Sequence, residues 1–218
     1  MPYSASETSA IAALADRIAR DLQSGAIAPG LWLKQIDLET RYQASRPAIR
    51  RALDQLVQNR LVRHIPNRGY YAFEPDDQTT AEITAIRIVL ETATAEPIIA
   101  HANSSDIAAL DHHAKQFEAL IHTGTLMELS DANLAFHRAL HALCGNAELV
   151  KLIHTLHQRT SAAPVGQWHT IAHIEASAAE HHAMVAAIAH RDVAQLRETI
   201  TRHILQAERK MPSKLQSP

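Results

Sequence analysis

The sequence predicts a mainly α-helical protein in which a small mixed N-terminal domain is followed by a larger all-α bundle. Hydrophobic residues make up 46% of the 218 residues, whereas aromatic residues make up 4% and there are 6 glycines. This Ala- and Leu-rich composition favours helices over a β-sandwich. After about residue 75 the apolar spacing stays helical, and before it the spacing changes several times along the chain.

The N-terminal domain begins with three expected helices. Apolar residues at i, i+3 and i+4 predict a helix over residues 7–24, which the stretch "SGAIAPG" ends. The stretch "LWLKQ" is expected to be short and extended, and "IDLETRYQA" is expected to be a short second helix. The third helix, "SRPAIRRALDQLVQNR", opens with Ser45 as N-cap and Pro47 in the first turn, where a missing N–H group is harmless.

A hairpin completes this domain. The stretches "LVRHI" and "YYAF" alternate as strands do, and "PNRG" supplies a tight turn between them. Helix, strand, helix, helix and hairpin within about 75 residues form the layout of a winged helix-turn-helix.

The distribution of charge suggests a polyanion as the partner of this domain. Residues 1–75 hold ten Lys and Arg against seven Asp and Glu, whereas residues 76–218 hold eleven against sixteen. Arg46, Arg50 and Arg51 lie in the first turns of the third helix, the part that reaches base edges and phosphates in the major groove. Asn67 and Arg68 lie at the hairpin tip, where a wing meets the DNA backbone or the minor groove. The alternative is an Arg-rich helix face that is only solvated.

The stretch from "AIAPGLWLKQ" to "NRGYYAF" resembles the DNA-binding domain of GntR-type bacterial transcription regulators. The shared marks are Pro29-Gly30, Leu33, Ser45-Arg46, Ile49-Arg50, Ala52-Leu53, Leu61-Val62 and Asn67-Arg68-Gly69. The resemblance implies that Arg46 and Arg50 contact the operator and that Gly69 lies in the wing. The sequence departs from the family at three positions. The proline usual in the recognition turn stands one place early, at Pro47, Arg51 stands where an acid is common, and Ile36 stands where some members have an operator-contacting Arg. The operator sequence therefore cannot be inferred from the family.

The second domain is expected to contain six helices. It follows a short linker just after Pro75, which interrupts regular structure. We expect the DNA-binding domain at residues 1–75, the linker at 76–77 and the helical domain at 78–212. The expected helices lie near residues 78–102, 105–123, 126–144, 147–162, 168–190 and 192–210, the last with Asp192 as N-cap.

Three of these helices place a histidine on an apolar stripe. His137 follows Asn133 by one turn beside Phe136 and Leu140, and His181 and His203 lie in phase with apolar residues of the last two helices. Imidazoles on three inward stripes are able to converge on a metal ion, as ligands do in bundle cores. The alternative is that each is a core histidine satisfied by a hydrogen bond.

The chain over roughly residues 80–210 is similar to the FCD domain, the helical effector-binding domain of many GntR regulators. The resemblance is carried by "AIRIVLE", "NLAFHRALHALCGN" and "EHHAMVAAIAHRDVAQLRETITRHI". It implies that Asn133, His137, His181 and His203 bind a divalent transition metal, for which Zn, Ni and Mn cannot be distinguished by ligand type. Many members have Asp at the place of Asn133. Four neutral ligands leave the site near +2, which strengthens attraction for an anionic effector.

We therefore expect the effector to be a small carboxylate metabolite that completes the coordination of the metal. Arg87 is a candidate second contact because guanidinium pairs bidentately with carboxylate. An ion pair between Arg87 and Glu91 at i+4 is the equal alternative.

The expected function is a ligand-responsive regulator, more often a repressor, that binds an operator in double-stranded DNA as a homodimer. Two alternatives stay open: a repressor for which the metal itself is the signal, and a metalloenzyme. Against the enzyme, the only acid near the ligands, Glu180, has a helical phase that turns it away. A lone Cys144, an N-terminus without a signal peptide and no apolar run near about 18 residues point to a soluble cytoplasmic protein without a membrane span.

Overall fold

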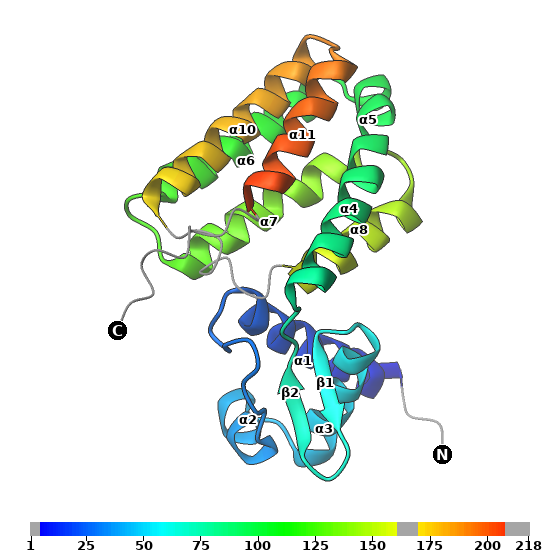
Figure 1. The fold of residues 1–218 in the computed structure, drawn as a ribbon, viewed down its shortest axis with the longest axis vertical. Coiled ribbons are helices and arrows are strands. Elements are labelled where there is room, and N and C mark those ends of the chain that lie inside the picture. The colour runs from blue at the N-terminus through cyan, green and yellow to red at the C-terminus, as the bar shows by residue number, and fades with distance from the viewer. Residues whose placement is uncertain (1–4, 161–169, 208–218) are drawn as a thin grey trace. The chain divides into compact units, whose positions relative to one another are not determined.

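The computed structural model describes residues 5–160 and 170–207. The chain divides into two compact units (Figure 1). The first contains the residues up to Asp76 together with residues 158–160 at the end of helix α8 (Ala147–Thr160), and the second contains the rest of the described chain from Asp77 on. The expected limit of the second domain at residue 212, the expected helix limits at residues 162, 168 and 210, and the expected break "APVG" lie outside the described residues.

The first unit is a winged helix-turn-helix, as the sequence predicts. Its elements are α1 (Ala5–Gln23), α2 (Gln35–Tyr42), α3 (Arg46–Gln58), β1 (Val62–Ile65) and β2 (Gly69–Ala72). The apolar stripes of α1 and α3 pack on each other, with Ile18, Ile49 and Leu53 fully buried. An antiparallel bridge between Trp32 and Tyr71 sets the extended segment before α2 beside β2.

The hairpin turn needs backbone conformations that few residues adopt. Ile65 pairs with Gly69, so residues 66–68 form the loop between the strands. Gly69 has φ +94°, and a Cβ there would lie 3.2 Å from Nε1 of Trp32. Asn67 has φ +61°, a region that Asn tolerates better than most residues. The sequence "PNRG" is therefore fitted to this tight wing.

The second unit is all α-helical among the described residues, which confirms the predicted class. Its helices are α4 (Asp77–Ala93), α5 (Ala95–His101), α6 (Ser104–Leu120), α7 (Leu126–Ala142), α8 (Ala147–Thr160), α10 (Ile171–Ala189) and α11 (Val193–Ala207). Helix α10 packs between α6 and α11, α7 packs on α6, and α4 lies beside α11 (Figure 1). The faces that meet contain Phe136, Met184, Ile188 and Ile200, all nearly inaccessible to solvent.

One expected helix is two helices. The helix predicted over residues 78–102 stops at Ala93, turns at Thr94 and resumes as α5. Pro97 explains the break because it has no N–H to donate to the carbonyl of Ala93, and its ring crowds that turn. The Thr94 hydroxyl donates to the Glu91 carbonyl over 2.6 Å and closes the last turn of α4.

Side-chain caps fix several helix starts in this unit. Asn103 with Asp106 begins α6, and Thr125 with Glu128 begins α7, each pair forming a reciprocal capping box. Asp192 accepts a hydrogen bond from the backbone N–H of Gln195 at 2.9 Å, so it caps α11 as predicted. Within residues 5–160 and 170–207, none of the helices combines the length and the apolar composition that crossing a bilayer requires.

Candidate metal centre and DNA-binding surface

The first turns of α3 present arginines to solvent. Arg46 and Arg50 are exposed, whereas Arg51 is half-buried. The Arg46 Nε donates to Oε1 of Gln35 over 3.1 Å, so a residue of α2 orients this guanidinium at the surface. Ser45 stands at the N-cap without a side-chain cap bond, and its exposed side chain lies at the same surface.

The wing adds a second group of exposed polar residues. Asn67 and Arg68 occupy the hairpin tip and are exposed, and Gly69 lies directly after them at the start of β2. The backbone N–H of Arg68 donates to the Ile65 carbonyl over 3.0 Å, which tightens the tip. The structure thus places all seven candidate DNA-binding residues in one unit, at the start of α3 with its N-cap and at the hairpin turn with the first residue of β2.

In the second unit, the three predicted histidines meet in the core. His137 comes from α7, His181 from α10 and His203 from α11, and one nitrogen of each lies within 4.8 Å of the others. Nε2 of His203 is 3.1 Å from Nε2 of His137. Two nitrogens that share an ion at about 2.0–2.1 Å from it lie roughly 3.0–3.4 Å apart, so this spacing suits a metal ion.

Unpaired buried atoms around this cluster also fit a metal ion. The Asn133 Oδ1, the His137 Nδ1 and both ring nitrogens of His181 are buried, and none has a hydrogen-bond partner within the described part of the chain. An unpaired buried polar atom costs about 1–3 kcal/mol. A neutral imidazole has one lone pair, so a cation would remove this cost at the Asn133 Oδ1 and at one nitrogen of His181, and these donors suit a divalent transition metal.

Burial keeps two of the imidazoles neutral. Burial, with the neighbouring His203 imidazole next, holds the pKa of His137 well below its ordinary value. Burial also holds the pKa of His181 well below its ordinary value, again with His203 as the next cause. The ring of Phe136 stacks on His181 with centroids 4.0 Å apart and fixes its plane. Neutral rings keep the lone pairs that bind a metal.

Glu180 lies against this cluster, contrary to the sequence prediction that turned it away. Its Oε2 accepts a hydrogen bond from the His203 Nδ1 at 2.9 Å, and the carboxyl group is buried. The helical phase of α10 alone misplaces Glu180, because α11 packs against the side of α10 that carries it. With Nδ1 protonated, the Nε2 lone pair of His203 faces the other histidines, the arrangement in which a carboxylate orients a metal-binding imidazole.

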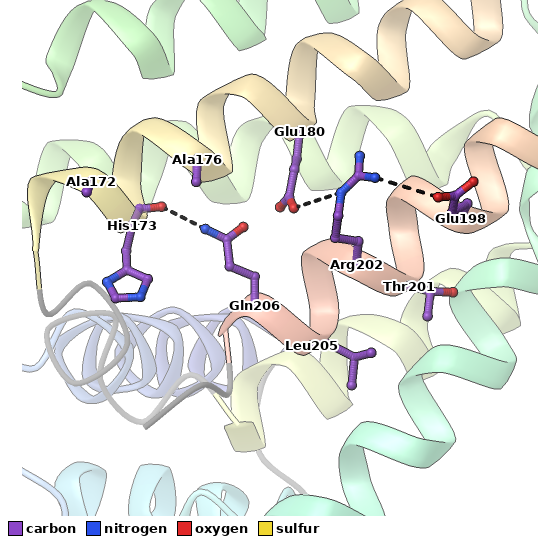
Figure 2. Close-up of a pocket in the computed structure, with 9 residues that line it drawn as sticks. All are labelled: Ala172, His173, Ala176, Glu180, Glu198, Thr201, Arg202, Leu205 and Gln206. Carbon is purple, nitrogen blue, oxygen red and sulfur yellow. Dashed lines mark hydrogen bonds and ion pairs between the residues drawn. The ribbon is translucent and has the colours of Figure 1, made fainter. Parts of the chain in front are cut away.

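The other oxygen of Glu180 faces a groove between α10 and α11. Figure 2 shows Arg202 reaching back from α11, where its Nε lies 3.3 Å from Oε1 of Glu180. His173 and Gln206 close one end of the groove, joined by a hydrogen bond from the Gln206 amide to the His173 carbonyl at 3.1 Å. Glu180 thus contacts both the histidine cluster and the groove.

Arg87 belongs to a second buried cluster. Its Nε donates to Oε1 of Glu91 over 2.9 Å, so the ion pair that the sequence left as one alternative is present. Its Nη2 lies 3.2 Å from Nε2 of His157 on α8. Burial raises the pKa of Glu91, but His157 and Arg87 reverse this and hold it well below its ordinary value.

Sequence reasoning missed two members of this second cluster. His141 lies one turn after His137 on α7, and its Nε2 is 3.4 Å from Oε2 of Glu91. His157 Nε2 is 2.8 Å from Oε1 of Glu91, and burial lowers the pKa of His157 to about 4. The repeat of polar residues at positions 133, 137 and 141 was the available signal for His141.

Comparisons with known proteins agree with both units. Residues 82–206 match the model of the FCD domain, and residues 10–71 match the model of bacterial regulatory proteins of the gntR family. The chain is 26% identical over 193 residues to the HTH-type transcriptional repressor GlaR of Escherichia coli (strain K12), covering 85% of this chain and 88% of that protein. It is 26% identical over 142 residues to the Nta operon transcriptional regulator of Aminobacter aminovorans, covering 64% and 66%.

Solved structures share the fold. Escherichia coli McbR/YncC superposes with a TM-score of 0.81 at 20% identity, covering 90% of this chain and 93% of that one. A structural-genomics structure described as a GntR regulator from Rhodococcus sp. RHA1 superposes with a TM-score of 0.77 at 20% identity, covering 92% and 96%.

Proposed function

The chain belongs to the gntR family of bacterial regulatory proteins and carries an FCD domain, and from this premise we propose that it is a repressor controlled by a small carboxylate metabolite bound at a divalent metal ion. The chain is a DNA-binding transcription regulator, and its relatives are regulators rather than enzymes. The proposal adds the sign of regulation, the metal and the class of effector. The observation that carries it is the meeting of His137, His181 and His203 at metal-ligand spacing.

The sign of regulation is argued from a relative. GlaR of Escherichia coli is named a transcriptional repressor, and it aligns with most of this chain. We assign the same sign here: the protein binds a roughly palindromic operator as a homodimer in the cytoplasm and leaves it when the effector binds. Each protomer would place Arg46 and Arg50 of α3 in the major groove, with Asn67 and Arg68 of the wing at the flanking backbone.

The metal would be held by His137, His181 and His203, with Asn133 as the fourth ligand. Bound there, a divalent cation supplies a Lewis-acidic position that a carboxylate oxygen can occupy. Glu180 would hold His203 in the tautomer that points its Nε2 lone pair at the ion. Since the four ligands are neutral, the ion keeps close to its full +2 charge, which favours an anionic effector over a neutral one.

Arg87 is proposed as the second contact of the effector carboxylate. Its guanidinium already binds a carboxylate, that of Glu91, so an effector that reaches Arg87 competes with this ion pair. To control transcription, the effector must bind the operator-free state more tightly than the operator-bound state. Effector binding then lowers the affinity for the operator by the same factor by which operator binding lowers the affinity for the effector.

Two variants test the two halves of the proposal in the full chain. An operator is first selected from a pool of random duplexes with the wild-type protein, and affinities are then measured by fluorescence anisotropy. Arg46→Ala should weaken operator binding and leave metal content unchanged. His137→Ala should lower metal content and abolish the effector response while basal operator binding persists. Metal content that is the same in His137→Ala as in the wild type contradicts the ligand assignment.

The effector class is tested by thermal shift with a panel of small carboxylates, each with and without a chelator. A ligand at 100 times its dissociation constant stabilises the protein by about 2.7 kcal/mol. We expect the stabilisation by the effector to vanish with chelator. If operator affinity instead follows metal concentration with no metabolite present, the metal itself is the signal.

A further inference from the structure

A second set of possible metal ligands lies next to the first in the core of the second unit. Glu91 of α4, His141 of α7 and His157 of α8 each offer one ligand atom, and these atoms lie within 4.8 Å of one another. We propose that this cluster binds a second divalent transition-metal ion, held by one carboxylate and two imidazoles. The cluster shares no residue with the centre formed by His137, His181 and His203.

The first argument is that His141 is buried and that its ring nitrogens are poorly satisfied. Its exposed fraction is 0%, and neither of its ring nitrogens has a hydrogen-bond partner among the residues that the structure describes. Its Nε2 lies 3.4 Å from Oε2 of Glu91, which is longer than the usual N–H···O hydrogen bond of about 2.7–3.2 Å, so this contact is weak. A tetrahedral ion with bonds of about 2.0–2.1 Å separates its ligand atoms by roughly 3.3–3.4 Å, so the gap has the size that an ion fills.

The second argument is that His157 has conflicting neighbours. Its Nε2 lies 2.8 Å from Oε1 of Glu91, which requires a proton on that nitrogen. The same nitrogen lies 3.2 Å from Nη2 of Arg87, which requires a lone pair there instead. One ring nitrogen cannot satisfy both neighbours. A cation that binds the Nε2 lone pair of His157 and the Glu91 carboxylate would replace the proton between them and remove this conflict.

The third argument is the chemistry of the donor set. Two imidazoles and one carboxylate are a common ligand set for zinc and its neighbours in the first transition row. The anionic Glu91 reduces the charge that two nearby cations would otherwise accumulate. The guanidinium of Arg87 opposes the ion, because it lies 2.9 Å from Oε1 of the same carboxylate. We therefore expect this cluster to bind its ion more weakly than the first centre.

The helix that supplies both clusters keeps them separate but adjacent. His137 and His141 lie one turn apart on α7, and their ring centroids are 6.0 Å apart. His157 lies 5.4 Å from His137 by the same measure. Each cluster also draws on different further helices, α10 and α11 for the first and α4 and α8 for the second.

The test counts ions bound to the full-length protein after chelation, reloading with Zn²⁺ and removal of free metal. Titration with Co²⁺, followed by visible absorption, reports the two environments independently. His157→Gln disables the second cluster at its least buried member, His203→Gln disables the first centre, and the exposed His112→Gln of α6 is the control. Circular dichroism establishes that each variant is folded, and His141→Gln replaces His157→Gln if the latter is not.

The expected result is two ions in the wild type and in His112→Gln, and one ion in each of the other two variants. An ion that His157→Gln loses and His203→Gln keeps supports the second site, even if the first centre proves empty. If His157→Gln retains every ion of the wild type, or if one shared ion disappears in both variants, the inference is overturned. If only His203→Gln loses an ion, the first centre stands as proposed and only the second site is refuted. A wild type that binds no ion refutes both.

Discussion

Replacing Glu180 with glutamine should weaken metal binding at the first centre about tenfold. The carboxylate accepts the His203 Nδ1–H at 2.9 Å in a buried position, and glutamine keeps its size and one acceptor oxygen while removing its charge. A hydrogen bond to a charged group contributes about 1.5–3 kcal/mol, and a neutral one about 0.5–1.5 kcal/mol. The difference of about 1–1.5 kcal/mol corresponds to a factor near ten in the dissociation constant.

Two features place this tenfold loss at the lower end of the range observed when a residue that orients a metal ligand is replaced. Loss of a residue that orients a metal ligand costs about 10–100-fold in affinity. The Arg202 Nε already lies 3.3 Å from Oε1 of Glu180. This half-exposed guanidinium partly neutralises the carboxylate, so the loss of the Glu180 charge matters less to His203. Glutamine also preserves the tautomer of His203, because its amide oxygen accepts from the same Nδ1–H.

The assay is a competition titration of Zn²⁺ against a chromophoric chelator at constant pH and ionic strength. The control is Glu198→Gln, which removes the same charge from α11, 3.9 Å from Nη1 of Arg202, at an exposed position. Equal affinities for Glu180→Gln and the wild type, with the fold intact, would refute the role of Glu180. A tenfold loss in Glu198→Gln would show that charge at a distance, not the hydrogen bond, causes the effect.

Three further predictions test other parts of the molecule. Arg50→Ala should weaken operator binding by about 1–3 kcal/mol in fluorescence anisotropy. The control, Lys115→Ala, removes an exposed charge from α6 and should leave operator binding unchanged. Equal losses in the two variants would argue against a specific contact of α3 with the operator. Gly69→Ala should lower the free energy of unfolding by about 1–3 kcal/mol in urea titrations, because φ is +94° and the new Cβ would lie 3.2 Å from Trp32 Nε1; unchanged stability would show that the wing relaxes. Because burial lowers the pKa of His157 from 6.5 to about 4, the unfolded metal-free chain binds more protons than the folded one between these values. Stability is therefore complete above pH 6.5 and falls as pH decreases, by about 2 kcal/mol at pH 5 from this residue; urea titrations in chelator at pH 7 and pH 5 should show this loss, and His157→Gln should reduce it.

Local sequence patterns predicted the elements and the first cluster because both depend on periodicity along single helices. His181, in phase with the apolar residues of its helix, is buried, whereas the next residue, His182, lies with its Nε2 3.1 Å from Oε2 of Glu118. Asn133 and His137 are likewise one turn apart on α7. The order of elements in the first unit was also readable, since each boundary carries a Gly, Pro or capping residue.

What the sequence could not supply depends on how helices pack against one another. The contact between Glu180 and His203 requires α11 to lie against one side of α10, and no spacing within α10 encodes that. The cluster around Glu91 joins three helices, of which α8 carries His157 at a position with no special pattern. The break before α5 is different, because Pro97 was visible in the sequence. The prediction of one continuous helix over residues 78–102 did not take into account that Pro97 has no N–H to donate.

Under the proposed metal binding, the unpaired imidazoles of the second unit would link the lifetime of the protein to its ions. Rings such as His181, buried with no hydrogen bond in the described chain, make the ion-free fold easier to open. Proteases act on opened chains, and their rate follows the population of such states. If this regulator acts as the proposed repressor, a cell short of metal would degrade it faster and so release its genes, even with the metabolite absent.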